Sequence, residues 1–169
     1  PMKNVSEAMG LRNALLDNFE RALTCASERE RQELLNIVIV GGGATGVEIA
    51  GALSEMKNFV LPKDYPDLPT SWMNIYLIEA GNRLLPAMSE ESSAHVEKYL
   101  RGMGVNVLLG KMVTDYDHHS VKLKDGSTIA TRTFIWVSGV AAEPIGNMPE
   151  QLLGRGRRIK VNACNEVEG

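Results

Sequence analysis

Asn36-Ile-Val-Ile-Val-Gly-Gly-Gly-Ala-Thr-Gly-Val-Glu-Ile-Ala-Gly51 combines a buried strand, a glycine-rich turn and the start of a helix. Ile37 to Val40 is an unbroken β-branched run, typical of a strand buried on both faces of a parallel sheet. Gly41, Gly43 and Gly46 then form G-x-G-x-x-G, which permits a tight turn, a close approach to a pyrophosphate and close helix–sheet packing. The helix that follows would present N–H groups and its positive dipole end to phosphates. The stretch therefore predicts a dinucleotide-binding strand–turn–helix unit.

Composition and charge are those of an ordinary globular protein. The chain has 169 residues, of which 44% are hydrophobic and 23% are charged, and its formal net charge is −3. This mild acidity argues against nucleic acid as a partner. No apolar run is long enough to span a bilayer, and Pro1–Gly10 lacks the apolar core of a signal peptide. Cys25 and Cys164 belong to no CxxC pattern, so we expect neither a redox pair nor a metal site.

The residues before and after the glycine turn have helical patterns. Residues 3–34 carry an apolar stripe at helical spacing, with a break expected at Gly10 and a second short helix beginning near Ser27. After the turn, a helix is predicted from Ala44 to about Lys57. Three prolines between residues 61 and 69 predict an irregular segment there, because proline cannot donate a backbone hydrogen bond.

The remaining elements complete an α/β domain. Strands are predicted at 74–79, 105–108 and 134–137, and a helix with Ser89 as its N-cap at 89–101. Between them, residues 111–116, 120–124 and 128–131 predict an antiparallel meander with a turn at Asp125-Gly126. The predicted fold is an α/β, Rossmann-like three-layer domain with a central parallel sheet, a three-stranded antiparallel β-meander and flanking helices.

An acidic residue at the end of the second strand is the next candidate for nucleotide binding. Glu79 lies 33 residues after Gly46, whereas the Rossmann pattern places an acid about 20 residues on, and the proline-rich insertion accounts for the difference. The carboxylate would accept hydrogen bonds from ribose hydroxyls and repel a 2′-phosphate, which favours NADH over NADPH. Arg83 nearby would reverse that preference if it paired with a phosphate. The alternative for Glu79 is a solvated carboxylate at a strand end.

Several local patterns together resemble type II NADH dehydrogenase, the single-chain NADH:quinone oxidoreductase that pumps no protons. They are Val40-Gly-Gly-Gly-Ala-Thr-Gly-Val-Glu-Ile-Ala-Gly51, Tyr65-Pro66, Leu77-Ile-Glu-Ala-Gly-Asn-Arg-Leu-Leu-Pro86, Asp125-Gly126 and Ile135-Trp-Val-Ser-Gly-Val140. The resemblance covers nearly the whole chain, and the segment from Glu79 to Pro86 is more specific than the glycines. Two positions depart from the family pattern: Ala44 replaces a common proline, and Val137-Ser138 replaces a usual Ala-Ala.

The resemblance implies the roles of further residues. Glu48 would lie beside the nicotinamide, although a carboxylate in a first helical turn is also favoured by the dipole alone. Gly139 follows the last strand, at the edge where Rossmann ligands lie, but could be an ordinary loop glycine. The full expected cofactor-binding set is Gly41, Gly42, Gly43, Ala44, Thr45, Gly46, Glu48, Glu79, Ala80, Arg83, Val113, Ser138 and Gly139, with Val113 lining the adenine pocket. No side chain is expected to be catalytic, because the cofactors do the chemistry.

The family resembles two Rossmann-like halves, an FAD domain and an inserted NADH domain, but this sequence contains one glycine fingerprint. We therefore expect residues 1–35 to lead in from an FAD domain, 36–140 to bind NAD(H), and 141–169 to begin the return to the FAD domain. The parent protein would pass hydride from NADH to FAD and electrons to a quinone, as a cytoplasmic enzyme peripheral to the inner face of the cell membrane. Its membrane contact would lie in other regions.

Two alternatives remain open from the sequence. One is the NAD(P)H domain of another flavoreductase, such as a disulfide, ferredoxin or nitrite reductase. The other is an NADH-sensing module without catalysis. In the preferred interpretation, the chain by itself would bind NADH weakly, hold no FAD and oxidise no NADH, because nothing in it addresses a flavin ring.

Overall fold

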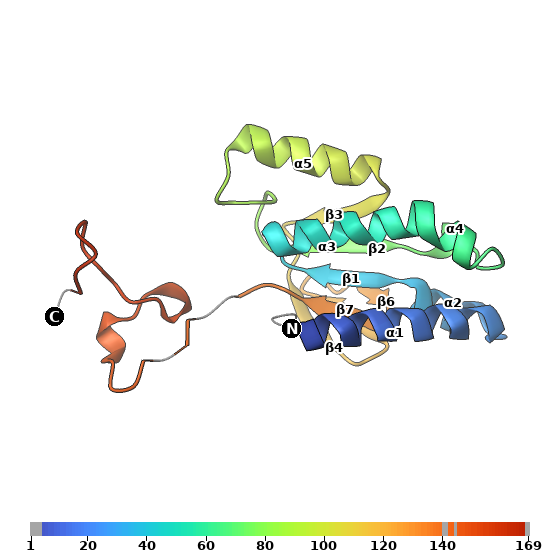
Figure 1. Cartoon of the computed structure of the whole chain (residues 1–169), viewed down its shortest axis with the longest axis horizontal. Coiled ribbons are helices and arrows are strands. Elements are labelled where there is room, and N and C mark those ends of the chain that lie inside the picture. The colour runs from blue at the N-terminus through green and yellow to red at the C-terminus, as the bar shows by residue number, and fades with distance from the viewer. Residues whose placement is uncertain (1–4, 140–141, 144, 168–169) are drawn as a thin grey trace. The chain divides into compact units, whose positions relative to one another are not determined.

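The computed structural model describes residues 5–139, 142–143 and 145–167 (Figure 1). The chain divides into two compact units, Pro1–Ser138 and Gly139–Gly169. Val140, the last residue of the predicted nucleotide domain, lies outside the described residues.

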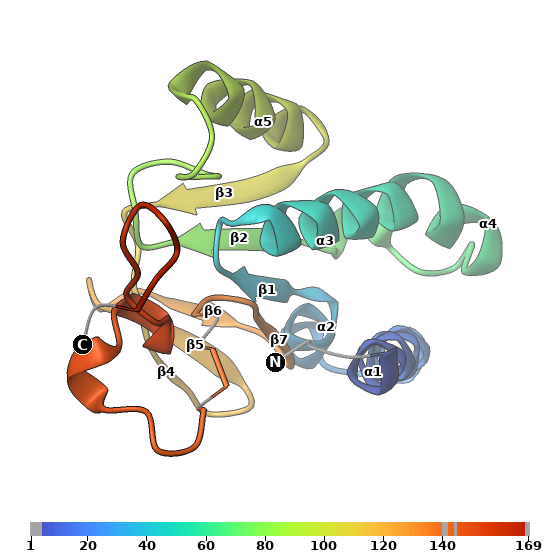
Figure 2. The same ribbon diagram turned by 60° about the vertical axis from the view of Figure 1, so that its left-hand side comes forward.

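A four-stranded parallel sheet forms the centre of the first unit. Its order is β3 (Val105–Leu109), β2 (Ile75–Glu79), β1 (Ile37–Val40) and β7 (Thr133–Trp136). Ile37 pairs with Ile75 on one side and with Thr133 on the other. The arrowheads of β1, β2 and β3 reach the same edge of the sheet (Figure 2). Because β1 has β2 on one side and β7 on the other, its carboxyl end is the point where Rossmann folds place their ligands.

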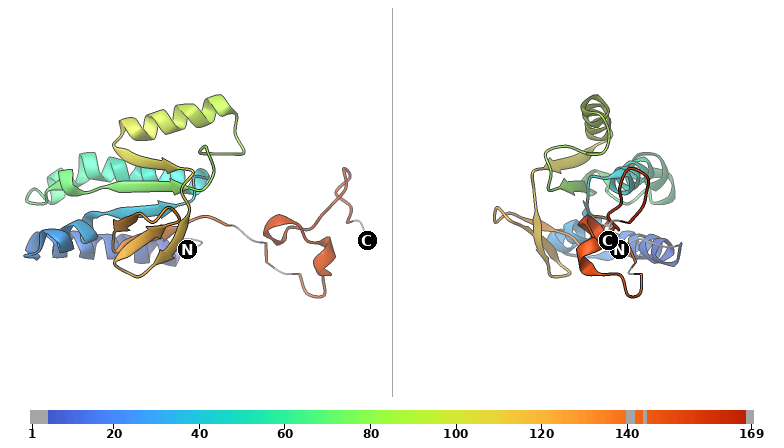
Figure 3. Two further views of the ribbon diagram at one scale, coloured as in Figure 1. Left: turned by 180° about the vertical axis from the view of Figure 1, so that it is seen from behind. Right: turned by 90° about the vertical axis from the view of Figure 1, so that its left-hand side faces the viewer.

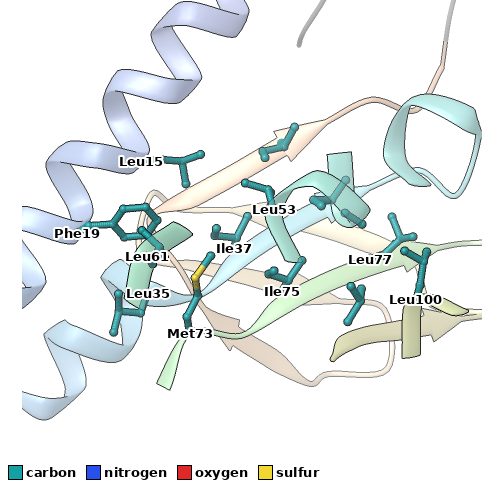
Figure 4. Close-up of a cluster of buried hydrophobic side chains, with 14 of the residues drawn as sticks. Leu15, Phe19, Leu35, Ile37, Leu53, Leu61, Met73, Ile75, Leu77 and Leu100 are labelled. Carbon is teal, nitrogen blue, oxygen red and sulfur yellow. The ribbon is translucent and has the colours of Figure 1, made fainter. Parts of the chain in front are cut away.

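The helices cover one face of this sheet. They are α1 (Val5–Thr24), α2 (Glu28–Leu35), α3 (Ala44–Glu55) and α5 (Glu90–Gly102). Alternate strand residues such as Ile37, Ile75 and Leu77 point to this face and are buried against the helices. Figure 4 shows Leu15 and Phe19 of α1 directed into the same cluster. The helices before β1 therefore contribute to the core of the nucleotide domain.

The opposite face is covered by an antiparallel meander of β4 (Val113–Tyr116), β5 (Ser120–Leu123) and β6 (Thr128–Ala130). Val121 and Leu123 pack there against Val38, Val40 and Ile78. The right-hand view of Figure 3 shows the meander and the helices on opposite sides of the sheet. The Asp125-Gly126 turn closes the β5–β6 hairpin, with Gly126 at φ 86°. The predicted three-layer Rossmann-like fold is confirmed.

Two predicted breaks were wrong. Helix α1 runs without interruption through Gly10, because its packing against the sheet outweighs the roughly 1 kcal/mol penalty of an internal glycine. The proline-rich segment also contains regular structure. A π-helical turn, η1 (Met56–Val60), joins α3 to α4 (Leu61–Asp64), and a 3₁₀ turn, η2 (Thr70–Trp72), follows. Pro62 lies in the first turn of α4, where proline removes no necessary hydrogen bond.

The second unit consists mostly of turns. It contains η3 (Glu150–Leu152), η4 (Arg155–Arg157) and two isolated bridges, Leu153 to Ile159 and Val161 to Val167. The division after Ser138 lies close to the predicted domain end. That residues 1–35 and 141–169 connect to an FAD domain stays a prediction.

Candidate functional site

The glycine turn at the carboxyl end of β1 is tightly packed at its first and last glycines. Gly41 has φ 120°, and a Cβ there would lie 2.9 Å from the Ser138 backbone nitrogen. A Cβ on Gly46 would lie 1.9 Å from the Gly41 carbonyl oxygen. Both positions require glycine for the turn itself, as the fingerprint predicts.

The middle glycine of the fingerprint is different. Gly43 is exposed and has φ −75°, which any residue adopts, and a Cβ there would meet no described atom within 4 Å. The protein's own packing therefore does not explain a glycine at this position. The space that a side chain would fill lies directly before the first turn of α3, where a phosphate would approach the backbone.

The N-terminus of α3 is open to solvent. Gly43 is its N-cap residue, and no side chain caps the helix among the described residues. Ala44 and Thr45 are exposed, as is Glu48 one turn later. The first turn therefore presents backbone N–H groups and the positive end of the helix dipole outward, an arrangement suited to an anion.

Glu79 is held in place by two backbone groups. Its Oε2 accepts a hydrogen bond from the Gly42 N–H at 2.6 Å, and its Oε1 accepts one from the Gly81 N–H at 2.7 Å. Each carboxylate oxygen can accept a further bond. The sequence predicted the position of this acid at the end of β2, but its contact with the glycine turn was not predicted.

Arg83 is engaged by its neighbours. Its guanidinium donates to the Pro86 carbonyl at 2.9 Å and lies 3.8 Å from the Glu90 carboxylate. Both partners belong to the loop and helix that follow β2, so this arginine has local bonds without any nucleotide.

Ala80 lines an open hollow of about 330 Å³, the Ala80 hollow, with Gly110, Lys111, Met112, Lys124 and Asp125. The Lys111 ammonium, hydrogen-bonded to Asp125, lowers the pKa of that carboxyl well below its ordinary value. Val113 is partly buried and packs against the apolar cluster beneath the meander, and its contact with the adenine stays a prediction. The exposed Met112 precedes it and lines the hollow, a residue that the sequence reasoning missed.

At the end of β7, Ser138 is exposed and its backbone contacts the position of Gly41. The Trp136 indole N–H donates to the Ser138 carbonyl at 2.8 Å and so fixes this exit from the sheet. Gly139 begins the second unit, with φ 79°. The structure thus brings the glycine turn, Glu79, Ala80 and Ser138 together at one edge of the first unit.

Within residues 5–139, 142–143 and 145–167, no group of three or more His, Cys, Asp or Glu side chains is placed to hold a metal ion. No helix among these residues is both long enough and apolar enough to cross a bilayer.

A family model described as pyridine nucleotide-disulphide oxidoreductase matches residues 4–168. The chain belongs to this family. Among curated relatives, it is 35% identical over 151 residues to a type II NADH:quinone oxidoreductase, NdhA, from Mycobacterium tuberculosis, covering 87% of the chain and 32% of the relative. It is 37% identical over 172 residues to the type II NADH:quinone oxidoreductase of Haemophilus influenzae, covering 95% and 37%. The resemblance stated from the motifs is confirmed.

A solved structure agrees with this family membership. The chain superposes on NDH2 from Plasmodium falciparum in complex with NADH with a TM-score of 0.78 and 28% identity, covering 83% of this chain and 30% of that one. The chain spans about a third of the length of the curated relatives it matches.

Proposed function

We propose that this chain binds NADH at the carboxyl edge of its parallel sheet, as the NADH-binding part of an NADH:quinone oxidoreductase. The observation that carries the proposal is Gly43, an exposed glycine with an ordinary φ and open space at its missing side chain. A pyrophosphate lying there would receive the backbone N–H groups of the first turn of α3. The NADH named with the NDH2 structure from Plasmodium falciparum and the names of the relatives support the same ligand.

The other residues of the edge divide between the two ends of the nucleotide. Glu79 would accept bonds from the adenine ribose with the lone pairs that the Gly42 and Gly81 N–H groups leave open. Ala80 and the Ala80 hollow suit the adenine, and Val113, the residue after the hollow-lining Met112, would lie beside the ring. Glu48, Ser138 and Gly139 would lie at the nicotinamide end. The Arg83 guanidinium lies beside the Glu90 carboxylate, whose negative charge would disfavour a 2′-phosphate there, so we expect NADH rather than NADPH.

The reaction itself would belong to the cofactors. In the parent protein, bound FAD would supply the chemistry of accepting hydride from NADH and passing electrons to a quinone. The residues described here would bind and orient the NADH, and an FAD domain of the same parent chain would be the partner of the nicotinamide end. Peripheral attachment to the inner face of the cell membrane, through other regions of the parent, is part of the same proposal.

The test is an NADH titration of the purified chain and of Gly43→Val. The added side chain would occupy the space assigned to the pyrophosphate, so we expect NADH affinity to fall at least about tenfold, which corresponds to about 1.4 kcal/mol. The free energy of unfolding should fall by about 1 kcal/mol at most, the cost of an unfavourable N-cap residue, since the added Cβ meets open space.

Gly10→Val is the matched control, because Gly10 is also exposed with open space around it and lies on α1. This variant should bind NADH as wild type does. A wild-type chain that binds no NADH would overturn the proposed function. Equal affinity for wild type and Gly43→Val would overturn the placement of the pyrophosphate.

A further inference from the structure

The turn Leu84-Leu-Pro86, one of the motifs that carry the resemblance, has an unusual backbone. Leu85 has φ 47°, in the left-handed region. A leucine there brings its Cβ close to the following carbonyl oxygen, so the conformation persists only where surrounding contacts enforce it. Leu84 beside it is fully buried.

The contacts that hold Leu85 lead directly to the glycine turn. The Leu85 N–H donates to the Gly42 carbonyl at 2.7 Å. The Leu85 carbonyl accepts from the Met88 N–H at 2.8 Å and from the Ser93 hydroxyl at 3.4 Å. Leu85 thus connects the start of α5 to the middle of the glycine-rich loop.

Gly42 is enclosed by the same segment of the chain. Its N–H donates to Glu79, and its carbonyl accepts from Leu85. A Cβ on Gly42 would lie 2.7 Å from the Leu84 Cδ2 atom and 3.0 Å from the stem of Glu79. Both polar backbone atoms and the α-carbon of Gly42 are therefore held by the residues that follow β2.

The Gly42 carbonyl and the Gly43 N–H belong to one peptide unit. The described chain contains no cis peptide bond, and in a trans peptide the C=O and N–H point in opposite directions. A hydrogen bond that fixes the Gly42 carbonyl toward Leu85 therefore directs the Gly43 N–H away from that turn. This N–H belongs to the glycine with open space at its α-carbon.

We propose that Leu85 is a positioning residue of the nucleotide site, whose left-handed backbone aims the Gly43 N–H at the NADH pyrophosphate. The inference rests on the proposed function and adds to it a residue that touches no ligand. Leu85 acts through its backbone conformation, and its side chain contributes only packing against the core.

Three substitutions at Leu85 distinguish a backbone role from a packing role, because the two roles predict opposite orders of NADH affinity. Glycine and asparagine adopt left-handed φ readily, whereas β-branched valine does not. We expect Leu85→Gly and Leu85→Asn to bind NADH within about threefold of wild type. Leu85→Val should bind about tenfold more weakly, because nucleotide binding must restore the displaced Gly42–Gly43 peptide. A role in packing alone gives the opposite order, since valine retains the most apolar surface.

A second readout needs no nucleotide. In amide NMR spectra of the NADH-free protein, the Gly43 resonance should shift in Leu85→Val and stay near its wild-type position in Leu85→Gly. The matched control is His118→Val, because His118 has φ 68° in the hairpin between β4 and β5. This substitution also places a β-branched residue at a left-handed φ, but in a hairpin far from the glycine turn. It should therefore leave both the Gly43 resonance and the NADH affinity unchanged.

The outcomes separate the two proposals. If wild type binds no NADH, the proposed function fails and the role assigned to Leu85 fails with it. If wild type binds NADH but Leu85→Val binds as well as Leu85→Gly or better, only the role of Leu85 is overturned. An unshifted Gly43 resonance in Leu85→Val would overturn it as well.

Discussion

The two edges of the parallel sheet are built differently. At the amino edge, polar groups from several elements bond to one another. Asn36, which precedes β1, is buried and bonds through its side chain to Gln32, Asn74 and the Ala130 carbonyl. The buried Glu33 lies 3.3 to 3.5 Å from Arg29, Arg132 and His119.

At the carboxyl edge, backbone groups and exposed residues take the place of this network. The first turn of α3 has no side-chain cap among the described residues, and Gly43, Ala44 and Thr45 are exposed. Glu79, at the end of β2, accepts from two backbone N–H groups of neighbouring loops. We infer that the amino edge contributes to stability, while the carboxyl edge leaves groups free for the ligand proposed above.

The largest effect is expected where the carboxyl edge depends on packing. Gly46→Ala places a carbon 1.9 Å from the Gly41 carbonyl oxygen, so α3 must move away from β1. We expect a loss of about 3 kcal/mol or more in the free energy of unfolding and a loss of NADH binding. Urea unfolding measures the loss of stability, and NADH titration measures the loss of binding. Gly51→Ala, on the same helix with open space, should instead stabilise the chain by up to about 1 kcal/mol.

If Gly46→Ala were as stable as wild type, the glycine turn would have to rearrange at a much lower energetic cost than its close contacts indicate. Gly43, the middle glycine of the same fingerprint, is under a different constraint. Gly46 is required by the packing of the protein itself, whereas Gly43 borders open space that we assign to the proposed ligand, in keeping with the separate roles of these glycines in the fingerprint.

The next largest effect on NADH binding is expected for a substitution of Glu79. Hydrogen bonds to a charged group contribute about 1.5–3 kcal/mol, so Glu79→Ser should weaken NADH binding about tenfold to a hundredfold and narrow the gap to NADPH. Because Glu79 also holds Gly42 and Gly81, a loss of affinity alone would not identify the ribose contact. NADH lacking the adenine-ribose 2′-hydroxyl separates the two roles.

Wild type should bind this deoxy analogue more weakly than NADH, and Glu79→Ser should bind both nucleotides alike. An equal penalty for the analogue in both proteins would show that Glu79 acts only through the glycine turn. Unchanged affinities for all nucleotides would remove Glu79 from the site.

Much of the fold was predictable because its signals are local. The β-branched run 37–40, the fingerprint glycines and Asp125-Gly126 each specify a backbone conformation within a few residues. The left-handed Leu85 was not predictable, because two of the bonds that enforce it come from Gly42 and Ser93, which lie outside its turn. Local propensity even opposes it.

The side chains of the candidate site were harder to predict than its glycines. Strand alternation fails in β4, because the pairing with β5 shifts register between Val113 and Asp115. Such a bulge redirects side chains and cannot be derived from an apolar pattern of four residues. The bulge leaves both Thr114 and Asp115 exposed, whereas strict alternation would place one of them on the face toward the sheet.

The smallest effect on NADH binding is expected for a substitution at the amino edge of the sheet. The buried Thr131 hydroxyl donates to the Asn36 carbonyl at 2.6 Å and accepts from the Thr133 N–H at 3.0 Å. Thr131→Val leaves both backbone groups buried without this partner, which costs about 1–3 kcal/mol of unfolding free energy. The change should appear as a lower urea midpoint with an unchanged slope, and the Kd for NADH should stay within about twofold, since distant sites are energetically independent. Thr128→Val, on the exposed edge strand β6, is the control and should alter neither quantity. An NADH affinity that fell in Thr131→Val but not in Thr128→Val would show that the two edges are coupled through β1, and the division between a stabilising edge and a binding edge would no longer hold.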